Sequence, residues 1–122
     1  MSLPAVYAVL NHPSVTKHFA GTLPLWFSGE VPQDPSPPYI VWSLPGGIEP
    51  SEYVTCQSNS DRYNVQIDVY AKGILKTASI TESIRKRLYN HGEVNFIAYD
   101  YESGDGLHRA IIDVAFFINP ME

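Results

Sequence analysis

Residues 62–71 read RYNVQIDVYA, and their side chains alternate between apolar and polar without a break. An alternation with a period of two is typical of a β-strand that buries one face. β-Branched and aromatic side chains, which favour strands, dominate the apolar row, so this stretch predicts a central strand of the fold. The apolar row is Tyr63, Val65, Ile67, Val69 and Ala71, and the polar row is Arg62, Asn64, Gln66, Asp68 and Tyr70.

The composition indicates a protein that folds as one domain, residues 1–122, and does not grip nucleic acid. The formal net charge is -5, from 8 basic and 13 acidic residues. This is the wrong sign for neutralising a phosphate backbone, although an acidic wall would let a duplex pass without sticking. No apolar run reaches the roughly 18 residues of a membrane helix. The N-terminus lacks the pattern of a signal peptide, so we expect synthesis in the cytoplasm and no membrane partner.

Helical patterns flank the strand stretches. Residues 74–90 are expected to form an amphipathic helix that Gly92 ends. Residues 3–19 predict an N-terminal helix in two pieces, broken at residues 11–14, with Ser14 as the N-cap of the second piece. The apolar side of the 74–90 helix would contain Ile74, Thr77, Ala78, Ile80, Ile84 and Leu88.

The remaining strands are predicted at residues 25–28, 39–44, 94–101 and 107–118. The last of these is apolar on nearly both faces, which is typical of the middle of a sheet. A crossover through the helix and a returning hairpin give the order 94–101, 107–118, 62–71, 39–44. The predicted fold is therefore α+β: a mostly antiparallel sheet of four to five strands, with the amphipathic helix on one face and an N-terminal helix.

On this order, Arg109 and Asp113 share a sheet face with the polar row of the central strand. Such a face could contact another subunit or line the lumen of a ring, or it could be solvated, with Arg109 and Asp113 in simple cross-strand pairs with opposite charges of the polar row. The sequence leaves these alternatives open. The candidate interface or lumen residues are Arg62, Asn64, Gln66, Asp68, Arg109 and Asp113.

Two connections are candidates for docking. Residues 31–38 read VPQDPSPP, and four prolines make this arm stiff and extended, as either a connector or a docking element. Residues 45–60 are too many for a tight hairpin and are typical of a functional or a disordered loop. The candidate docking residues are Pro32, Gln33, Asp34, Glu49, Glu52 and Tyr53.

The sequence contains no nucleophile motif, phosphate-binding glycine loop or metal-ligand spacing, so no catalytic, cofactor or metal site is predicted. Cys56 is the only cysteine, which excludes an internal disulfide. The acidic stretch containing Asp100, Glu102 and Asp105 lacks the full loop that calcium needs. A small hydrolase or nuclease using Asp100, Glu102 and Asp113 is the enzyme alternative.

The run PQDPSPPYIVW at residues 32–42, followed by RYNVQIDVYAK at 62–72, a helix and a final apolar strand, resembles the tail completion and tail terminator family of long-tailed bacteriophages and prophages. The matching positions are Pro32 and Gln33, the PYIV of residues 38–41, and residues 62–71. Order and spacing, rather than any chemical signature, carry the resemblance.

The resemblance implies a structural, non-enzymatic α+β subunit that forms a homo-oligomeric ring, often a hexamer, at the head-proximal end of the tail tube. Such a ring stops tube polymerisation and provides the surface for head–tail joining. The implied partners are other copies of the chain, the major tail tube protein and head–tail connector proteins, with DNA as passing cargo. The implied location is the tail–neck region of the virion, after synthesis in the host bacterial cytoplasm. A head-side neck or connector protein is the alternative.

Overall fold

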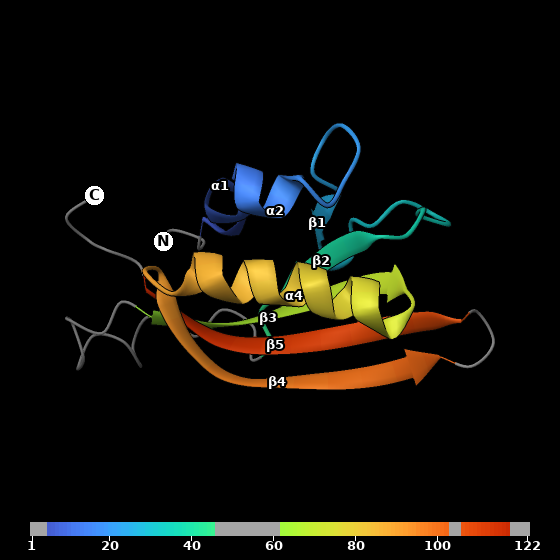
Figure 1. Cartoon of the computed structure of the whole chain (residues 1–122). Coiled ribbons are helices and arrows are strands. Elements are labelled where there is room, and N and C mark those ends of the chain that lie inside the picture. The colour runs from blue at the N-terminus through green and yellow to red at the C-terminus, as the bar shows by residue number, and fades with distance from the viewer. Residues whose placement is uncertain (1–4, 46–61, 103–105, 118–122) are drawn as a thin grey trace.

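The structure is a computed structural model of the chain, and it describes residues 5–45, 62–102 and 106–117. Within these ranges, two short helices are followed by three strands, a long helix and two further strands (Figure 1). The elements are α1 (Val6–Leu10), α2 (Pro13–Thr16), β1 (Leu25–Phe27), β2 (Tyr39–Ser43), β3 (Arg62–Lys72), α4 (Ile74–Leu88), β4 (Gly92–Glu102) and β5 (Leu107–Phe117).

The five strands form one sheet in the order β1-β2-β3-β5-β4, which confirms the order predicted for the four longer strands. The β2–β3, β3–β5 and β4–β5 pairs are antiparallel, but β1 pairs with β2 in parallel, so the sheet is mixed. The proline-rich connection between β1 and β2 explains this. It is long enough to carry the chain back to the starting end of β1, whereas a tight hairpin would have reversed its direction.

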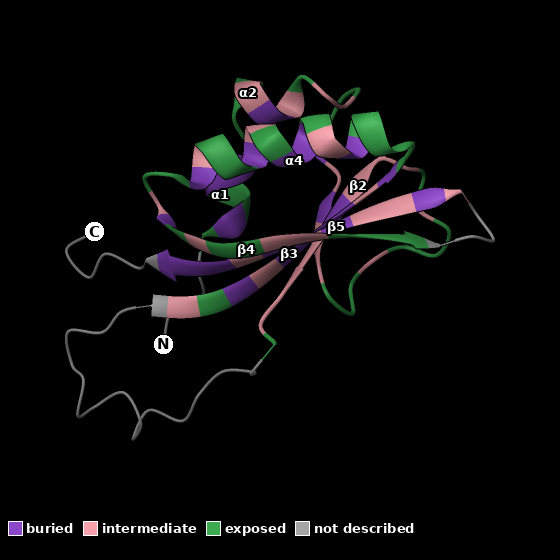
Figure 2. Cartoon of the chain, turned by 60° about the horizontal axis from the view of Figure 1, so that its bottom comes forward, coloured by how far each residue is buried: buried purple, intermediate pink, exposed green. Residues whose placement is uncertain are grey.

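The core lies between the sheet and α4, where Ile67 of β3 and Val114 of β5 are fully buried with Ile80, Ile84 and Leu88 of the helix. The apolar rows of β3 and β5 therefore pack under α4, on the face where the amphipathic helix was predicted. Figure 2 shows the gradient across the sheet: β5, in the middle of the sheet, is largely buried, while the edge strand β4 is mostly exposed or half-buried.

The boundaries of α4 differ from the prediction in two respects. The helix ends at Leu88, and Gly92 is not its terminator but the first residue of β4. A Cβ at Gly92 would lie 2.5 Å from the carbonyl oxygen of Ala115, so the close approach of two strands is what requires glycine there. Ile74, expected on the buried side, is 45% exposed, because it begins the helix beyond the covered part of the sheet.

The N-terminal helices α1 and α2 lie on the same side of the sheet as α4 (Figure 1) and are shorter than predicted. Three bonds join this segment to α4: Arg87 Nε donates to the Val9 carbonyl at 2.7 Å, His18 Nε2 lies 2.9 Å from Ser83 Oγ, and Lys76 donates to the His18 carbonyl at 3.3 Å.

The N-cap of α2 is also corrected. It is His12, whose Nδ1 accepts from the Ser14 backbone N–H at 3.2 Å, and not Ser14, because Pro13 already occupies the first helical position. Among the described residues, no helix is long and apolar enough to cross a membrane.

Candidate functional site

The described helices all lie on one side of the sheet, which leaves the other face of β3 and β5 as the candidate site (Figure 1). We call it the open face. The register places Gln66 opposite Asp113 and Tyr70 opposite Arg109, so the polar residues of both strands share this face. Because side chains in a strand alternate, the same face carries Asn64 and Asp68.

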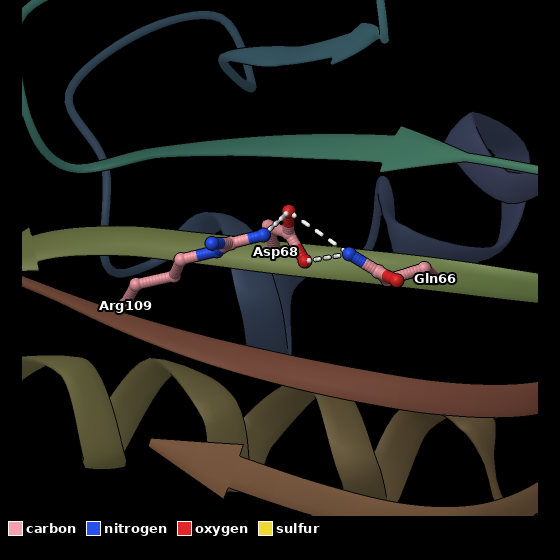
Figure 3. Close-up of polar contacts among 3 residues, drawn as sticks. All are labelled: Gln66, Asp68 and Arg109. Carbon is pink, nitrogen blue, oxygen red and sulfur yellow. Dashed lines mark hydrogen bonds and ion pairs between the residues drawn. The ribbon is translucent and has the colours of Figure 1, made fainter. Parts of the chain in front are cut away.

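Three of the predicted interface residues form a bonded group on the open face (Figure 3). Arg109 Nη2 donates to Asp68 Oδ2 at 2.9 Å, and Gln66 Nε2 donates to Asp68 Oδ1 and Oδ2 at 3.0 and 3.3 Å. We call Gln66, Asp68 and Arg109 the locked triad. Asp68 is only 7% exposed, which corrects its expected place in an exposed polar row. Its two neighbours cover the carboxylate and satisfy its oxygens.

Aromatic rings extend the locked triad toward the β1 edge of the sheet. The Arg109 guanidinium lies 5.8 Å from the centre of the Tyr70 ring, a cation–π distance, and Tyr39 stacks on Tyr70 with centroids 4.8 Å apart. Trp26 continues the row, with its ring 6.3 Å from that of Tyr39. Burial acts to lower the pKa of Arg109, but the Asp68 charge and hydrogen bond raise it above its usual value. The cation is therefore permanent and already paired.

The other half of the open face contains a hollow of about 290 Å³. A β-bulge between Val94 and Phe96 shifts the register of β4, so that Phe96 stands opposite Asp113 on β5. Phe96 remains 54% exposed, and its ring forms part of the wall. The residues that line the hollow are Pro45, Asn64, Gln66, Asn95, Phe96 and Asp113.

Asp113 is half-buried and has no hydrogen bond or ion pair within the described part of the chain. Of Arg109 and Asp113, only Arg109 therefore forms a cross-strand pair of the expected kind within the described residues, with Asp68. The two residues lie four positions apart on β5, which separates them by about 13 Å along the strand. One half of the open face is neutralised internally, while the other presents a carboxylate that no described residue pairs with, beside an aromatic ring and amide groups.

The carboxylates of the enzyme alternative do not meet around the hollow. Asp100 stands opposite Arg109 and bonds to the Tyr101 backbone N–H at 2.8 Å, whereas Asp113 stands opposite Phe96. The side chain of Glu102 and all of Asp105 lie outside the described residues. Within the residues that are described, no group of three histidine, cysteine or acidic side chains could hold a metal ion.

The structure describes three of the six candidate docking residues. Pro32, Gln33 and Asp34 are exposed on the connection between β1 and β2. Glu49, Glu52 and Tyr53, like Cys56, lie outside the described residues, as do most of residues 45–60 and the side chain of Arg62. The site residues that the sequence reasoning missed are Asn95 and Phe96, since a bulge inside an alternating strand has no signal of its own in the residue pattern.

An open sheet face that carries a locked triad, stacked rings and a small polar hollow is typical of a structural subunit that contacts other proteins. Residues 4–119, nearly the whole chain, match the family model described as Tail completion protein gp17, so the chain belongs to this family of phage tail completion proteins. Its role is thus a structural one in the phage tail. Comparison with curated proteins and with solved structures found no match.

Proposed function

We propose that the chain forms a homo-oligomeric ring, a hexamer, at the head-proximal end of the tail tube, where it stops tube polymerisation and provides the surface for head–tail joining. The observation that carries the proposal is the family match over residues 4–119. The partners are then other copies of the chain, the major tail tube protein and the head–tail connector proteins.

The open face supports a role in contacts between subunits. Half-buried rings and satisfied polar groups are the usual composition of protein interfaces, in which tyrosine, tryptophan and arginine are enriched. One row across four strands of the sheet provides these residue types: Trp26 on β1, Tyr39 on β2, Tyr70 on β3 and Arg109 on β5. Because the Arg109 charge is already neutralised by Asp68, this row can be covered without leaving the guanidinium unpaired.

The charge of the whole chain fits a conduit for DNA. A net charge of -5 would give the ring an acidic surface that repels phosphate and lets the duplex pass. The exposed arm residues Pro32, Gln33 and Asp34 supply a docking element for a neighbour in the ring or for the tail tube.

Deleting the gene from the phage or prophage that carries it tests the proposal. We expect tails of irregular length that fail to join heads, measured by electron microscopy as a broadened distribution of tail lengths, with rescue by the wild-type gene. Tails of normal length together with this protein on isolated heads would instead assign the chain to the head-side neck. Normal infectious particles without the gene would overturn both roles.

The arm gives a second readout of assembly. If Pro32, Gln33 and Asp34 dock in the ring, amide hydrogens of the flanking residues exchange more slowly in assembled tails than in the free subunit. The amides of the α4 core serve as the matched control, because they are protected in both states. Equal exchange of the arm in both states would remove it from the interface.

A further inference from the structure

The hollow on the open face has the composition of a receptor for a cation. Asp113 supplies a half-buried carboxylate without an ion pair among the described residues, and Phe96 supplies an exposed ring above which a cation is stabilised. Asn64 and Asn95 add amide oxygens that accept hydrogen bonds. By contrast, the Asp68 charge is already neutralised by Arg109, so Asp113 is the carboxylate that the hollow offers.

The same chain carries an exposed cation on the helix side of the sheet. Arg85, Lys86 and Arg87 are consecutive in the last turn of α4. Glu82 pairs with Arg85, and the Val9 carbonyl accepts from Arg87, whereas Lys86 is exposed and has neither a hydrogen bond nor an ion pair with any described residue.

Lys86 and the hollow lie at the same end of the sheet, on opposite sides. The helix ends at Leu88, and the chain then enters β4 at Gly92, which pairs with Phe116. Asp113 lies three residues from Phe116, so the basic end of α4 and the hollow belong to the same end of the sheet on opposite sides. Lys72 is also exposed, but it stands opposite Leu107 in the strand register, at the other end of the sheet from the hollow.

We propose that the hollow receives the Lys86 ammonium of a second copy of this chain, so that the helix layer of one subunit docks on the open face of the next. The contact is heterologous, one surface meeting a different one, and such contacts close into a ring when the rotation between subunits permits. Tyr89, which is 79% exposed beside Lys86, adds apolar area to the contact. The inference rests on the proposed ring and names its interface.

Charge exchange tests the pairing. Asp113→Lys and Lys86→Asp should each weaken self-association at least about ten-fold, because each places like charges together, and the double variant should restore most of it. Asp100→Asn is the matched control for Asp113→Asn, since it removes the same charge at an exposed position of the open face outside the hollow and places no cation opposite Arg109. Asp113→Asn removes the charge with little change of shape, and circular dichroism checks that each variant is folded.

The readouts are sedimentation velocity over a range of concentrations and zero-length carbodiimide cross-linking of a mixture of ¹⁴N- and ¹⁵N-labelled protein. A Lys86–Asp113 cross-link between differently labelled peptides is expected in wild type and in Asp100→Asn. Single variants that associate like wild type, a double variant no better than the singles, or the absence of a mixed-label cross-link would each overturn the pairing.

The experiments distinguish an incorrect Lys86–Asp113 contact from the absence of a ring. Wild type and variants that all form the same oligomer would remove the Lys86–Asp113 contact and leave the ring in place. A wild-type protein that remains monomeric both in solution and on isolated tails would remove the ring itself. If Asp113→Lys self-associates normally but yields no joined particles, the hollow receives a basic group of a different tail or connector protein, which also overturns the pairing of copies.

Discussion

Arg109 and Asp68 bond diagonally across β3 and β5: the register places Arg109 opposite Tyr70 and Asp68 opposite Ile111, yet the guanidinium reaches the carboxylate at 2.9 Å. The diagonal keeps the guanidinium 5.8 Å from the centre of the Tyr70 ring and joins it to Asp68, which lies between Arg109 and Asp113 along the sheet. One long side chain therefore neutralises Asp68 and leaves Asp113 without an ion pair among the described residues.

Removing the carboxylate of the locked triad should destabilise the fold. Asp68→Ala leaves the guanidinium of Arg109 partly buried without its counter-ion, and the amide of Gln66 without its acceptor. Because the Arg109 side chain is 27% exposed, water recovers part of the loss. We expect a cost of about 2 kcal/mol in the free energy of unfolding, below that of breaking a fully buried pair. Urea unfolding at pH 7 measures it.

Two comparisons isolate this effect. Asp100→Ala removes an exposed carboxylate from the same face and should change stability by less than about 0.5 kcal/mol. A double replacement, Asp68→Leu with Arg109→Met, removes both charges and should recover most of the loss. Equal costs for Asp68→Ala and Asp100→Ala would show that the diagonal pair contributes nothing.

The core prediction concerns Ile67, which is fully buried between β3 and α4. Ile67→Asp places an uncompensated carboxylate in the core and should cost more than about 4 kcal/mol, enough to prevent folding. Ile67→Val removes one methylene group and should cost only about 1 kcal/mol. Thermal melting followed by circular dichroism distinguishes the two, and a folded Ile67→Asp protein with unchanged melting would contradict the packing described for β3.

The sequence predicted those parts of the fold that depend on periodicity. The alternation of residues 62–71 and the apolar character of β5 identified the two central strands, their order and the face under α4, because burial acts on every second residue of a strand. The parallel β1–β2 pair was missed because a short strand after a long connection leaves its direction undetermined.

Only part of the site could be predicted, because the residue pattern determines the sheet face of a side chain but not its conformation. The strand order places four polar residues on one face, and this was predicted: Gln66, Asp68, Arg109 and Asp113. Which carboxylate pairs with Arg109 depends on the rotamer of the arginine side chain, and no residue pattern encodes that rotamer. The position of Phe96 depends on the bulge in β4. The family match covers the whole sheet but does not assign roles to these side chains.

Gly92 tests how closely β4 approaches β5. The added methyl group of Gly92→Ala would lie 2.5 Å from the Ala115 carbonyl oxygen and 3.1 Å from Cγ2 of Val114, so the strands must separate. We expect a loss of about 1–3 kcal/mol, as is usual for overpacking in a core. Asn90→Ala, at a nearby exposed position, is the control. A midpoint of urea unfolding equal to that of wild type would show that the strand end relaxes without cost.

The attachment of the N-terminal helices should weaken in acid through His18. Burial, followed by the charges of Lys76 and Lys17, lowers the pKa of His18 below its usual value of about 6.5. The unfolded chain then binds a proton more readily than the folded one, so the stabilisation is fully present above about pH 6.5 and is lost as the pH falls through the lowered pKa. His18→Gln keeps a hydrogen-bonding group near Ser83 but does not titrate. Urea unfolding of both proteins at pH 7.5 and at pH 5 should therefore show a larger loss of stability for wild type than for His18→Gln, and the comparison cancels the titration of the other groups. Equal losses in the two proteins would mean that the titration of His18 does not contribute to the attachment of the N-terminal segment.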